Sequence, residues 1–150
     1  MAAGFTSQET QRRQKDALKT GNCVGPNAAN TVNTNAISLE TGNGATFFPT
    51  NGDVEVHLSS TIGTGANSKN INYALQHTNS NSDGTADNGN WVNIPELAIQ
   101  VVGGNTTNTG ALNTYVTLPP STKPWIRGTA TGEANGGAST DLVFTVDLLF

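Results

Sequence analysis

The sequence TDLVFTVDLLF, residues 140–150, closes the chain with a regular alternation of side chains. Every second position is apolar, and these positions are Leu142, Phe144, Val146 and Leu148. Successive side chains of a β-strand point to opposite faces, so this spacing predicts a strand with one face turned toward a core.

The same period of two recurs along most of the chain. Two further segments, DVEVHLSS (53–60) and KNINYALQH (69–77), alternate as cleanly. Their inward-facing side chains are predicted to be Val54, Val56, Leu58, Ile71, Tyr73 and Leu75. Weaker or interrupted strands are predicted at 35–39, 90–94, 96–102, 112–118 and 124–131. About eight strands with turn residues between them, and no helical period, predict an all-β fold. The expected architecture is an antiparallel β-sandwich or jelly roll over residues 26–150.

Residues 1–25 differ from the rest and are predicted to form an N-terminal arm. The run TSQETQRRQKDALKTG begins with a capping-box pattern, in which Thr6 is followed three positions later by Glu9, and it continues with good helix formers. This pattern predicts a short helix over about 7–19. Because apolar residues are sparse here, we expect the arm to be ordered by what it touches. The alternative is a frayed terminal tail.

Charge is scarce and unevenly placed. Only 12% of the 150 residues are charged and the net charge is −4, so the chain as a whole is a poor ligand for nucleic acid. The first twenty positions nevertheless hold four of the seven Lys and Arg residues: Arg12, Arg13, Lys15 and Lys19. We expect a weakly basic arm on an acidic body. Since no run is apolar enough for a signal peptide or a transmembrane helix, we expect no membrane partner, and a protein that stays in the cytosol or in an assembly made there.

The most polar stretch is HTNSNSDGTADNGNW, residues 77–91. Its NSNSDG segment places Asn79, Asn81 and Asp83 at alternate positions, as a calcium loop begins. The position of the bidentate glutamate in such a loop is occupied here by Asn90. Asn, Asp and Gly are also the residues that favour turns. We therefore predict a long solvated connection between two strands, built from Asx turns and without a metal ion.

No set of residues has the spacing of a catalytic or cofactor site. His57 is expected on the polar face of its strand and His77 at a strand end, neither with a metal ligand or triad partner at a recognisable spacing. Cys23, the only cysteine, has no base near it in sequence and is interpreted as a small, partly buried apolar residue. No pair of carboxylates is identified for glycoside hydrolysis. We predict no catalytic residue, no cofactor and no enzymatic activity.

Three large side chains are candidates for recognition. Trp91 and Trp125 are each the one large aromatic residue of their strand, which favours core or interface packing, while a sugar-stacking platform remains open. Arg127 lies in a strand of small and apolar residues, where it either pairs with a carboxylate across the sheet or contacts a neighbouring subunit. We take Trp91, Trp125 and Arg127 as candidates for an oligomer interface.

Three stretches resemble one known family. NYALQHTNSNSDGTADNGNWVNIPEL is similar to its strand, polar loop and strand, and TDLVFTVDLLF is similar to its terminal apolar strand. TYVTLPPSTKPWIRGTATGEANGG is similar to its Leu-Pro turn, which is followed by an aromatic residue, an aliphatic residue and Arg. Through these stretches, the run from about Thr31 to Phe150 resembles the small jelly-roll decoration, or cement, proteins of tailed-bacteriophage capsids. It covers about four fifths of the chain, and residues 1–25 depart from the shorter members of the family.

The resemblance implies a non-catalytic virion protein on the outer capsid surface. It would be a dimer or trimer that clamps neighbouring subunits of the major capsid protein and so stabilises the assembled lattice. The expected capsid contacts are Phe5, as an apolar anchor, and the basic residues Arg12, Arg13, Lys15 and Lys19. Deleting residues 1–20 is expected to weaken capsid binding and to leave the body folded. The alternative is a phage fibre or surface head domain that binds host glycans through Trp91, Trp125 and the 78–90 loop.

Overall fold

The computed structural model describes the chain over residues 15–27, 29–39, 54–63, 70–94, 97, 99–101, 103–104, 108–109, 111–134 and 137–149. These residues form twelve strands and no α-helix. The strands are β1 (Lys15–Val24), β2 (Thr31–Asn33), β3 (Ile37–Ser38), β4 (Glu55–Ser60), β5 (Ile71–Thr78), β6 (Val92–Asn93), β7 (Ile99–Val101), β8 (Gly103–Gly104), β9 (Asn108–Thr109), β10 (Asn113–Thr117), β11 (Trp125–Gly132) and β12 (Val143–Leu149).

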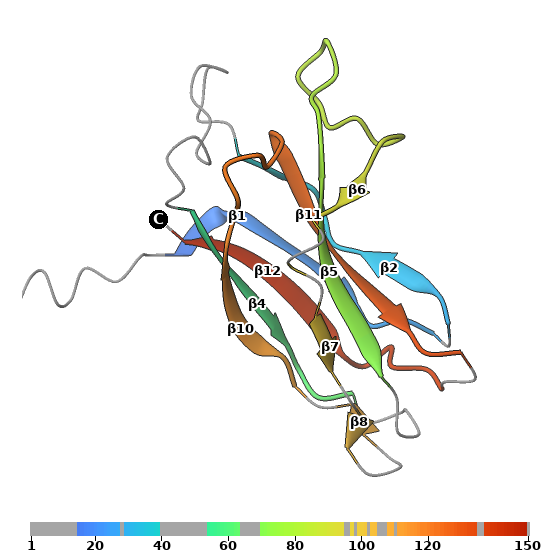
Figure 1. Cartoon of the computed structure of the whole chain (residues 1–150). Coiled ribbons are helices and arrows are strands. Elements are labelled where there is room, and N and C mark those ends of the chain that lie inside the picture. The colour runs from blue at the N-terminus through green and yellow to red at the C-terminus, as the bar shows by residue number, and fades with distance from the viewer. Residues whose placement is uncertain are drawn as a thin grey trace, which may run out of the picture.

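The strands build two antiparallel sheets and a separate β8–β9 hairpin (Figure 1). The four-stranded sheet has the order β1-β12-β4-β10. The six-stranded sheet has the order β2-β11-β5-β6, with β3 also paired to β11 and β7 to β5. When β3 and β7, which lie off the main path of their sheet, and the separate β8–β9 hairpin are set aside, eight strands remain. Their chain order reads 1-8-3-6 in one sheet and 2-7-4-5 in the other. This is the order of a jelly roll, in which two Greek keys are wound together. The predicted fold class is confirmed.

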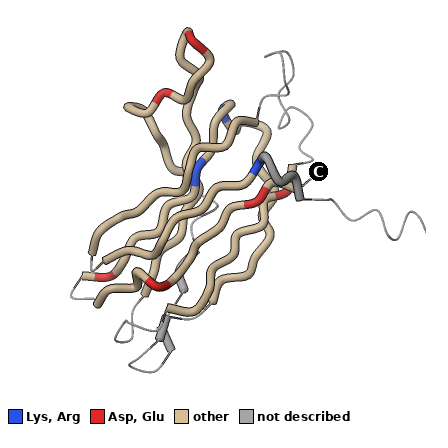
Figure 2. Tube along the Cα trace, turned by 180° about the vertical axis from the view of Figure 1, so that it is seen from behind, with Lys and Arg blue, Asp and Glu red and all other residues tan. Residues whose placement is uncertain are grey.

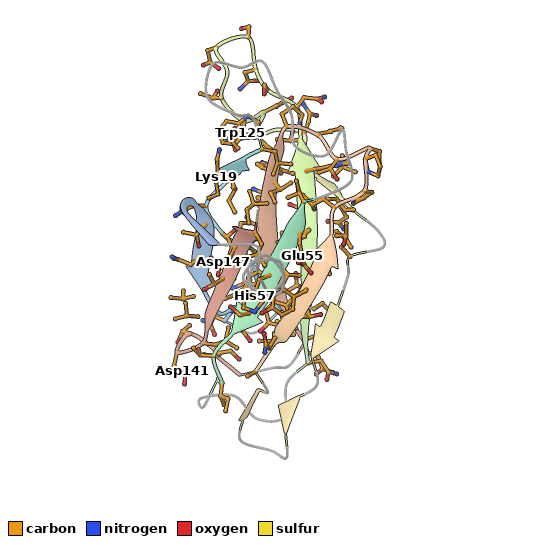
Figure 3. The ribbon with its side chains drawn as sticks, turned by 90° about the vertical axis from the view of Figure 1, so that its left-hand side faces the viewer. Lys19, Glu55, His57, Trp125, Asp141 and Asp147 are labelled. Atoms are coloured by element: carbon orange, nitrogen blue, oxygen red, sulfur yellow. The ribbon has the colours of Figure 1, made fainter. Side chains whose placement is uncertain are left out.

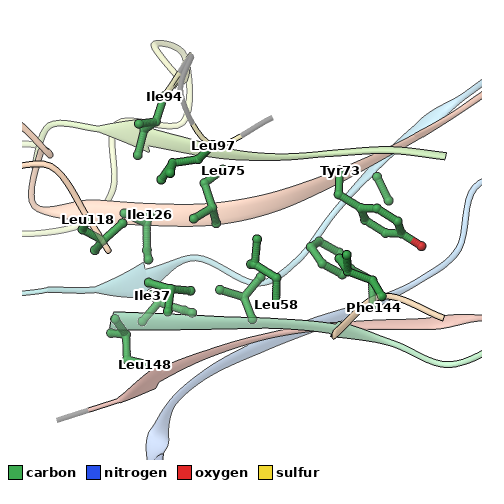
Figure 4. Close-up of a cluster of buried hydrophobic side chains, with 14 of the residues drawn as sticks. Ile37, Leu58, Tyr73, Leu75, Ile94, Leu97, Leu118, Ile126, Phe144 and Leu148 are labelled. Atoms are coloured by element: carbon green, nitrogen blue, oxygen red, sulfur yellow. The ribbon is translucent and has the colours of Figure 1, made fainter. Parts of the chain in front are cut away.

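The core lies between the two sheets. Every side chain predicted to face inward, from the strands at 53–60, 69–77 and 140–150, is buried. Tyr73 and Phe144 come from opposite sheets and pack with their ring centroids 4.7 Å apart (Figure 4). The Tyr73 hydroxyl donates a hydrogen bond to Ser60 Oγ at 3.3 Å, so this polar group keeps a partner inside the core. The alternation in the sequence therefore identifies which face of each strand is buried.

The N-terminal segment differs from its prediction. The expected helix over about 7–19 is wrong for residues 15–19, because β1 begins at Lys15 and pairs with β12. Residues 1–14, which include the first part of this expected helix, lie outside the described part of the chain. The pairing aligns Thr20 with Asp147 and Val24 with Val143, with an irregularity between Lys15 and Thr20.

The physical reason is that a strand in this segment is stabilised by pairing and packing with the rest of the chain, which an isolated helix lacks. A helix of about 13 residues without a broad apolar stripe is marginal in water. As a strand, residues 20–24 pair continuously with β12, Lys15 pairs with Leu149, and Cys23 packs against the core. Residues 15–24 therefore belong to the sheet and not to the predicted arm of residues 1–25.

Candidate functional site

Each sheet has one face on the core and one outer face, and the outer faces carry the residues that are available for function. Charged residues are sparse over the described chain (Figure 2). The outer face of the four-stranded sheet centres on His57 and Asp147, whereas Trp125 lies farther along the molecule on the other sheet (Figure 3). The two outer faces therefore differ in chemistry.

His57 lies in the middle of the four-stranded sheet. Its Cα partners are Asp147 on β12 and Tyr115 on β10. Its ring stacks on the ring of Tyr115, with centroids 4.5 Å apart and an angle of 16° between the planes. Nε2 lies 2.7 Å from Asn113 Oδ1, a carbonyl oxygen that can only accept, so Nε2 donates. Nδ1 lies 3.9 Å from Asp147 Oδ2.

Asp147 connects this histidine to the edge of the sheet. Its side chain is almost fully buried, and Oδ1 accepts a hydrogen bond from Thr20 Oγ1 at 2.5 Å. An Asp–His pair becomes the base of a nucleophile only when the outer ring nitrogen faces a hydroxyl or thiol. Here Nε2 faces the Asn113 amide instead, so the arrangement joins β1, β12, β4 and β10 and does not activate a nucleophile.

The same outer face exposes apolar side chains. Val24 and Val143 are Cα partners on β1 and β12, and they are 56% and 41% exposed. Tyr115, on the opposite edge strand, is 56% exposed although one side of its ring stacks on His57. Single exposed apolar residues are common on protein surfaces, but an adjacent pair on an open sheet face is suited to contact with another protein.

The predicted capsid-contact residues divide into two groups. Phe5, Arg12 and Arg13 lie outside the described residues. Lys15 begins β1 opposite Leu149. The Lys19 ammonium donates to the backbone carbonyl of Ser38 on β3 at 2.6 Å, which connects the two sheets. Lys19 thus has a partner within its own chain, and its role in capsid contact stays a prediction.

The outer face of the six-stranded sheet brings Trp91 and Arg127 together. The centre of the Arg127 guanidinium lies 4.4 Å from the centroid of the Trp91 ring. Arg127 Nε donates to Gln76 Oε1 at 2.9 Å, and Gln76 Nε2 donates to Asn93 Oδ1 at 2.9 Å. Arg127, Gln76 and Asn93 are aligned by strand register across β11, β5 and β6, and we refer to them as the Arg127 row. The cross-strand partner of Arg127 is therefore an amide.

Trp125 lies on the same face and is tied to the 79–90 loop. Its indole N–H donates to Ser80 Oγ at 3.1 Å, and the Trp91 indole N–H donates to Asn88 Oδ1 at 3.3 Å. Thr78 is the Cα partner of Trp125, and its hydroxyl proton is shared between the backbone carbonyls of Asp87 and Asn90, at 2.9 and 3.0 Å from Oγ1. These hydrogen bonds hold the loop at the end of the six-stranded sheet where β5 ends and β11 begins, beside the Arg127 row. The role of Trp91, Trp125 and Arg127 in an oligomer interface stays a prediction.

The 79–90 loop consists of tight turns, as the sequence predicted. Asp83 Oδ1 accepts hydrogen bonds from the Thr85 hydroxyl at 2.6 Å and from its backbone N–H at 3.0 Å, and these bonds lower the pKa of Asp83. Gly84 has a φ of 82°, which glycine adopts without strain. Asp87 accepts from the N–H of Gly89 and from the Asn90 side chain. Among the residues described, no group of three His, Cys, Asp or Glu side chains is arranged to hold a metal ion.

Cys23 and His77, the remaining candidates, each contact groups that hold the fold together. Burial raises the pKa of the Cys23 thiol to about 11, and Cys23 packs against the core, which confirms its interpretation as a partly buried apolar residue. His77 Nδ1 accepts a hydrogen bond from the backbone N–H of Lys123 at 3.3 Å. Burial, and then the charge of Lys123, lower the pKa of His77.

Comparison with known proteins assigns no family to this arrangement: the sequence matches no protein-family model and no curated protein. Within the described ranges, no helix has the length and apolar character that crossing a membrane requires.

Sequence reasoning missed most of the residues that complete the two faces. Gln76 and Asn93 are ordinary amides, and only the strand register places them beside Arg127. No pattern in the sequence singles out Asp147, because its contact with His57 depends on the pairing of β12 with β4. The alternation of the 69–77 strand was the one available signal, because it places Gln76 on the face opposite Leu75.

Proposed function

We propose that this protein is a non-catalytic capsid decoration protein, which binds the outside of an assembled major capsid lattice and stabilises it by bridging subunits. The observation that carries the proposal is the outer face of the four-stranded sheet, where Val24, Val143 and Tyr115 are exposed on a rigid antiparallel scaffold. This face offers area for protein contact, and its one histidine is engaged with Asn113. The resemblance of the strands and loops to phage cement proteins supports the same function.

The N-terminal segment supplies the second contact. Lys15 pairs with Leu149, so residues 1–14 join the body at one end of the four-stranded sheet. Fully extended, fourteen residues span at most about 46–50 Å, enough to reach a neighbouring capsid subunit. This segment contains Phe5, Arg12 and Arg13, which would give an apolar anchor and two positive charges for an acidic capsid surface.

Weak contacts of this kind are sufficient when several act together. In a dimer or trimer, the second contact forms at high effective concentration, and avidity exceeds a single affinity by about 10²–10⁴. A protein that binds only the assembled lattice stabilises that lattice by mass action. The proposed function therefore requires the exposed face of the four-stranded sheet, the N-terminal segment and self-association, and it requires no catalysis. Its partners are the major capsid protein and copies of itself, and its location is the outer surface of the virion.

Co-sedimentation with expanded phage capsids that lack the protein tests this proposal. We expect the purified chain to pellet with the capsids, to saturate at a fixed number of copies per capsid subunit, and to bind less at higher salt. Val143→Glu should weaken pelleting, because it places a charge in the proposed contact face. The matched control is Val92→Glu, since Val92 is 50% exposed, similar to the 41% of Val143, but belongs to the six-stranded sheet.

A truncation that tests the N-terminal segment must leave β1 (Lys15–Val24) intact. Deleting residues 1–20 would remove residues 15–20, more than half of β1, together with the Thr20–Asp147 bond, so loss of binding could reflect a damaged sheet. Deleting residues 1–14 leaves β1 whole and should weaken binding while the melting temperature stays unchanged. A folded full-length chain that never pellets would refute the decoration function for that shell.

A further inference from the structure

The Arg127 row contains a positive charge that no acidic group of the described chain neutralises. Arg127 uses Nε for Gln76 and one face of its guanidinium for Trp91. The four N–H groups on its two terminal nitrogens have no hydrogen-bond partner among the described residues. The two carboxylates of the adjacent loop are held within the loop, Asp83 by Thr85 and Asp87 by its own neighbours.

The guanidinium is also held in one orientation. The bond from Nε to Gln76 and the stacking on Trp91 fix its plane, and the bond from Gln76 to Asn93 fixes the Gln76 amide in turn. A planar guanidinium with two free terminal nitrogens matches the two oxygens of a carboxylate. Because its orientation is set before binding, little side-chain freedom is lost when such an anion arrives.

The groups around this guanidinium suit a sugar better than a protein surface. Asn93 is exposed and keeps its side-chain N–H₂ group unbonded among the described residues, and Gln76 is partly exposed. Side-chain amides both donate and accept, as sugar hydroxyls do. The tryptophans add flat apolar area at the end of the row. The exposed valine pair that suits protein contact lies on the other sheet.

We propose that the outer face of the six-stranded sheet, at the Arg127 row, binds an acidic glycan, with a sugar carboxylate on the terminal nitrogens of Arg127. Asn93 would bond neighbouring hydroxyls, and Trp91 would hold the guanidinium in place. This site goes beyond capsid decoration and does not depend on it, because it lies on the sheet opposite the proposed capsid contacts. A decoration protein with this site would attach to its shell by one face and to carboxylated sugars by the other.

The test is tryptophan fluorescence and calorimetric titration of the full chain with two acidic probes, 3′-sialyllactose and trigalacturonic acid. The neutral counterparts are lactose and the methyl ester of trigalacturonic acid. We expect saturable binding of at least one acidic probe, and binding of its neutral counterpart that is weaker by about 10- to 100-fold, the usual effect of a lost charge-assisted bond. Arg127→Gln should weaken binding of the acidic probe by a similar factor, and Arg127→Lys by less.

Controls separate the site from general charge and from folding. Lys123→Gln removes one positive charge outside the row and should leave the dissociation constant unchanged. Asn93→Ala changes an exposed residue and should weaken binding without lowering the melting temperature. Absence of saturable binding by either acidic probe, equal binding of the neutral sugars, or no effect of Arg127→Gln would each overturn the proposal.

The main competing occupant is a second copy of this chain. Light scattering of the wild type and of Arg127→Gln decides this point: a shift from oligomer to monomer in the variant would make the row a subunit interface and overturn the sugar site. Capsid co-sedimentation of Arg127→Gln keeps the two proposals distinct. A variant that loses sugar binding but still pellets supports both, and a wild type that binds sugar but never pellets refutes decoration alone.

Discussion

Replacing Gly128 with alanine should destabilise the sandwich, because the two sheets approach each other closely at this glycine. Gly128 lies in β11 and is buried. A Cβ atom built at this position would lie 2.5 Å from Phe144 Cε1 and 2.6 Å from Val146 Cγ2. Carbon atoms pack favourably at about 3.5–4.0 Å, so β11 or the two side chains would have to move by about 1 Å.

The expected size follows from two opposing effects. Forcing a methyl group into a well-packed core costs typically about 1–3 kcal/mol. Alanine also restricts the unfolded chain relative to glycine, which stabilises by about 0.4–1 kcal/mol. We therefore expect a net loss of about 1–2 kcal/mol in the free energy of unfolding. For a chain of this length that loss lowers the melting temperature by roughly 2–8 °C.

Urea denaturation and calorimetry measure this loss, and two further variants isolate its cause. Gly89→Ala is the control, because its added Cβ would meet only Asp87 Oδ1 at an ordinary 3.6 Å. In a Phe144→Leu background, the cost of Gly128→Ala should be smaller, since the ring atoms nearest to the new methyl group are gone. A Gly128→Ala protein that melts at or above the wild-type temperature would show that the sheets are not packed this closely.

Three further predictions concern single groups. Thr20→Val removes a hydrogen bond to the buried Asp147 carboxylate and should lower the free energy of unfolding by about 1.5–3 kcal/mol in urea titrations; an unchanged value would contradict the pairing of β1 with β12. Burial and Lys123 lower the pKa of His77 below 6.5 in the folded chain, so the unfolded chain binds more protons and the free energy of unfolding should fall as pH drops below that value. His77→Gln should therefore reduce the fall in melting temperature between about pH 7.5 and pH 5.5. An equal fall in the wild type and the variant would refute this. Cys23, with a pKa raised to about 11, should react far more slowly with a disulfide reagent at pH 8 when native than in urea, and equal rates would contradict its burial.

The sequence was most informative where a pattern is local. Alternation at 53–60, 69–77 and 140–150 depends only on the two-residue period of a strand, so the buried face of each could be predicted without knowing its partner. The Asx turns of the 79–90 loop were likewise predictable, because Asp83 bonds to Thr85 only two positions away.

The N-terminal segment shows where local patterns fail. Its residues favour a helix in isolation, but from Lys15 onward they form β1 on the edge of β12, a strand at the other end of the chain. The gain from completing that sheet is non-local, since Thr20 and Asp147 are 127 positions apart, and no window of sequence contains it. The Arg127 row likewise depends on non-local pairing, because the register of three strands brings Arg127 beside Gln76 and Asn93.

A two-layer sandwich also constrains how the two proposed surfaces combine. Its two outer faces point in opposite directions across sheets packed about 10 Å apart, so one flat partner surface cannot contact side chains on both faces. If Val143 contacts the capsid, Arg127 on the other sheet is directed away from that contact. Val143→Glu and Arg127→Gln should therefore have independent effects, each on one binding activity. Coupling between them would mean that both residues contact the same partner, as they would at an interface between copies of the chain.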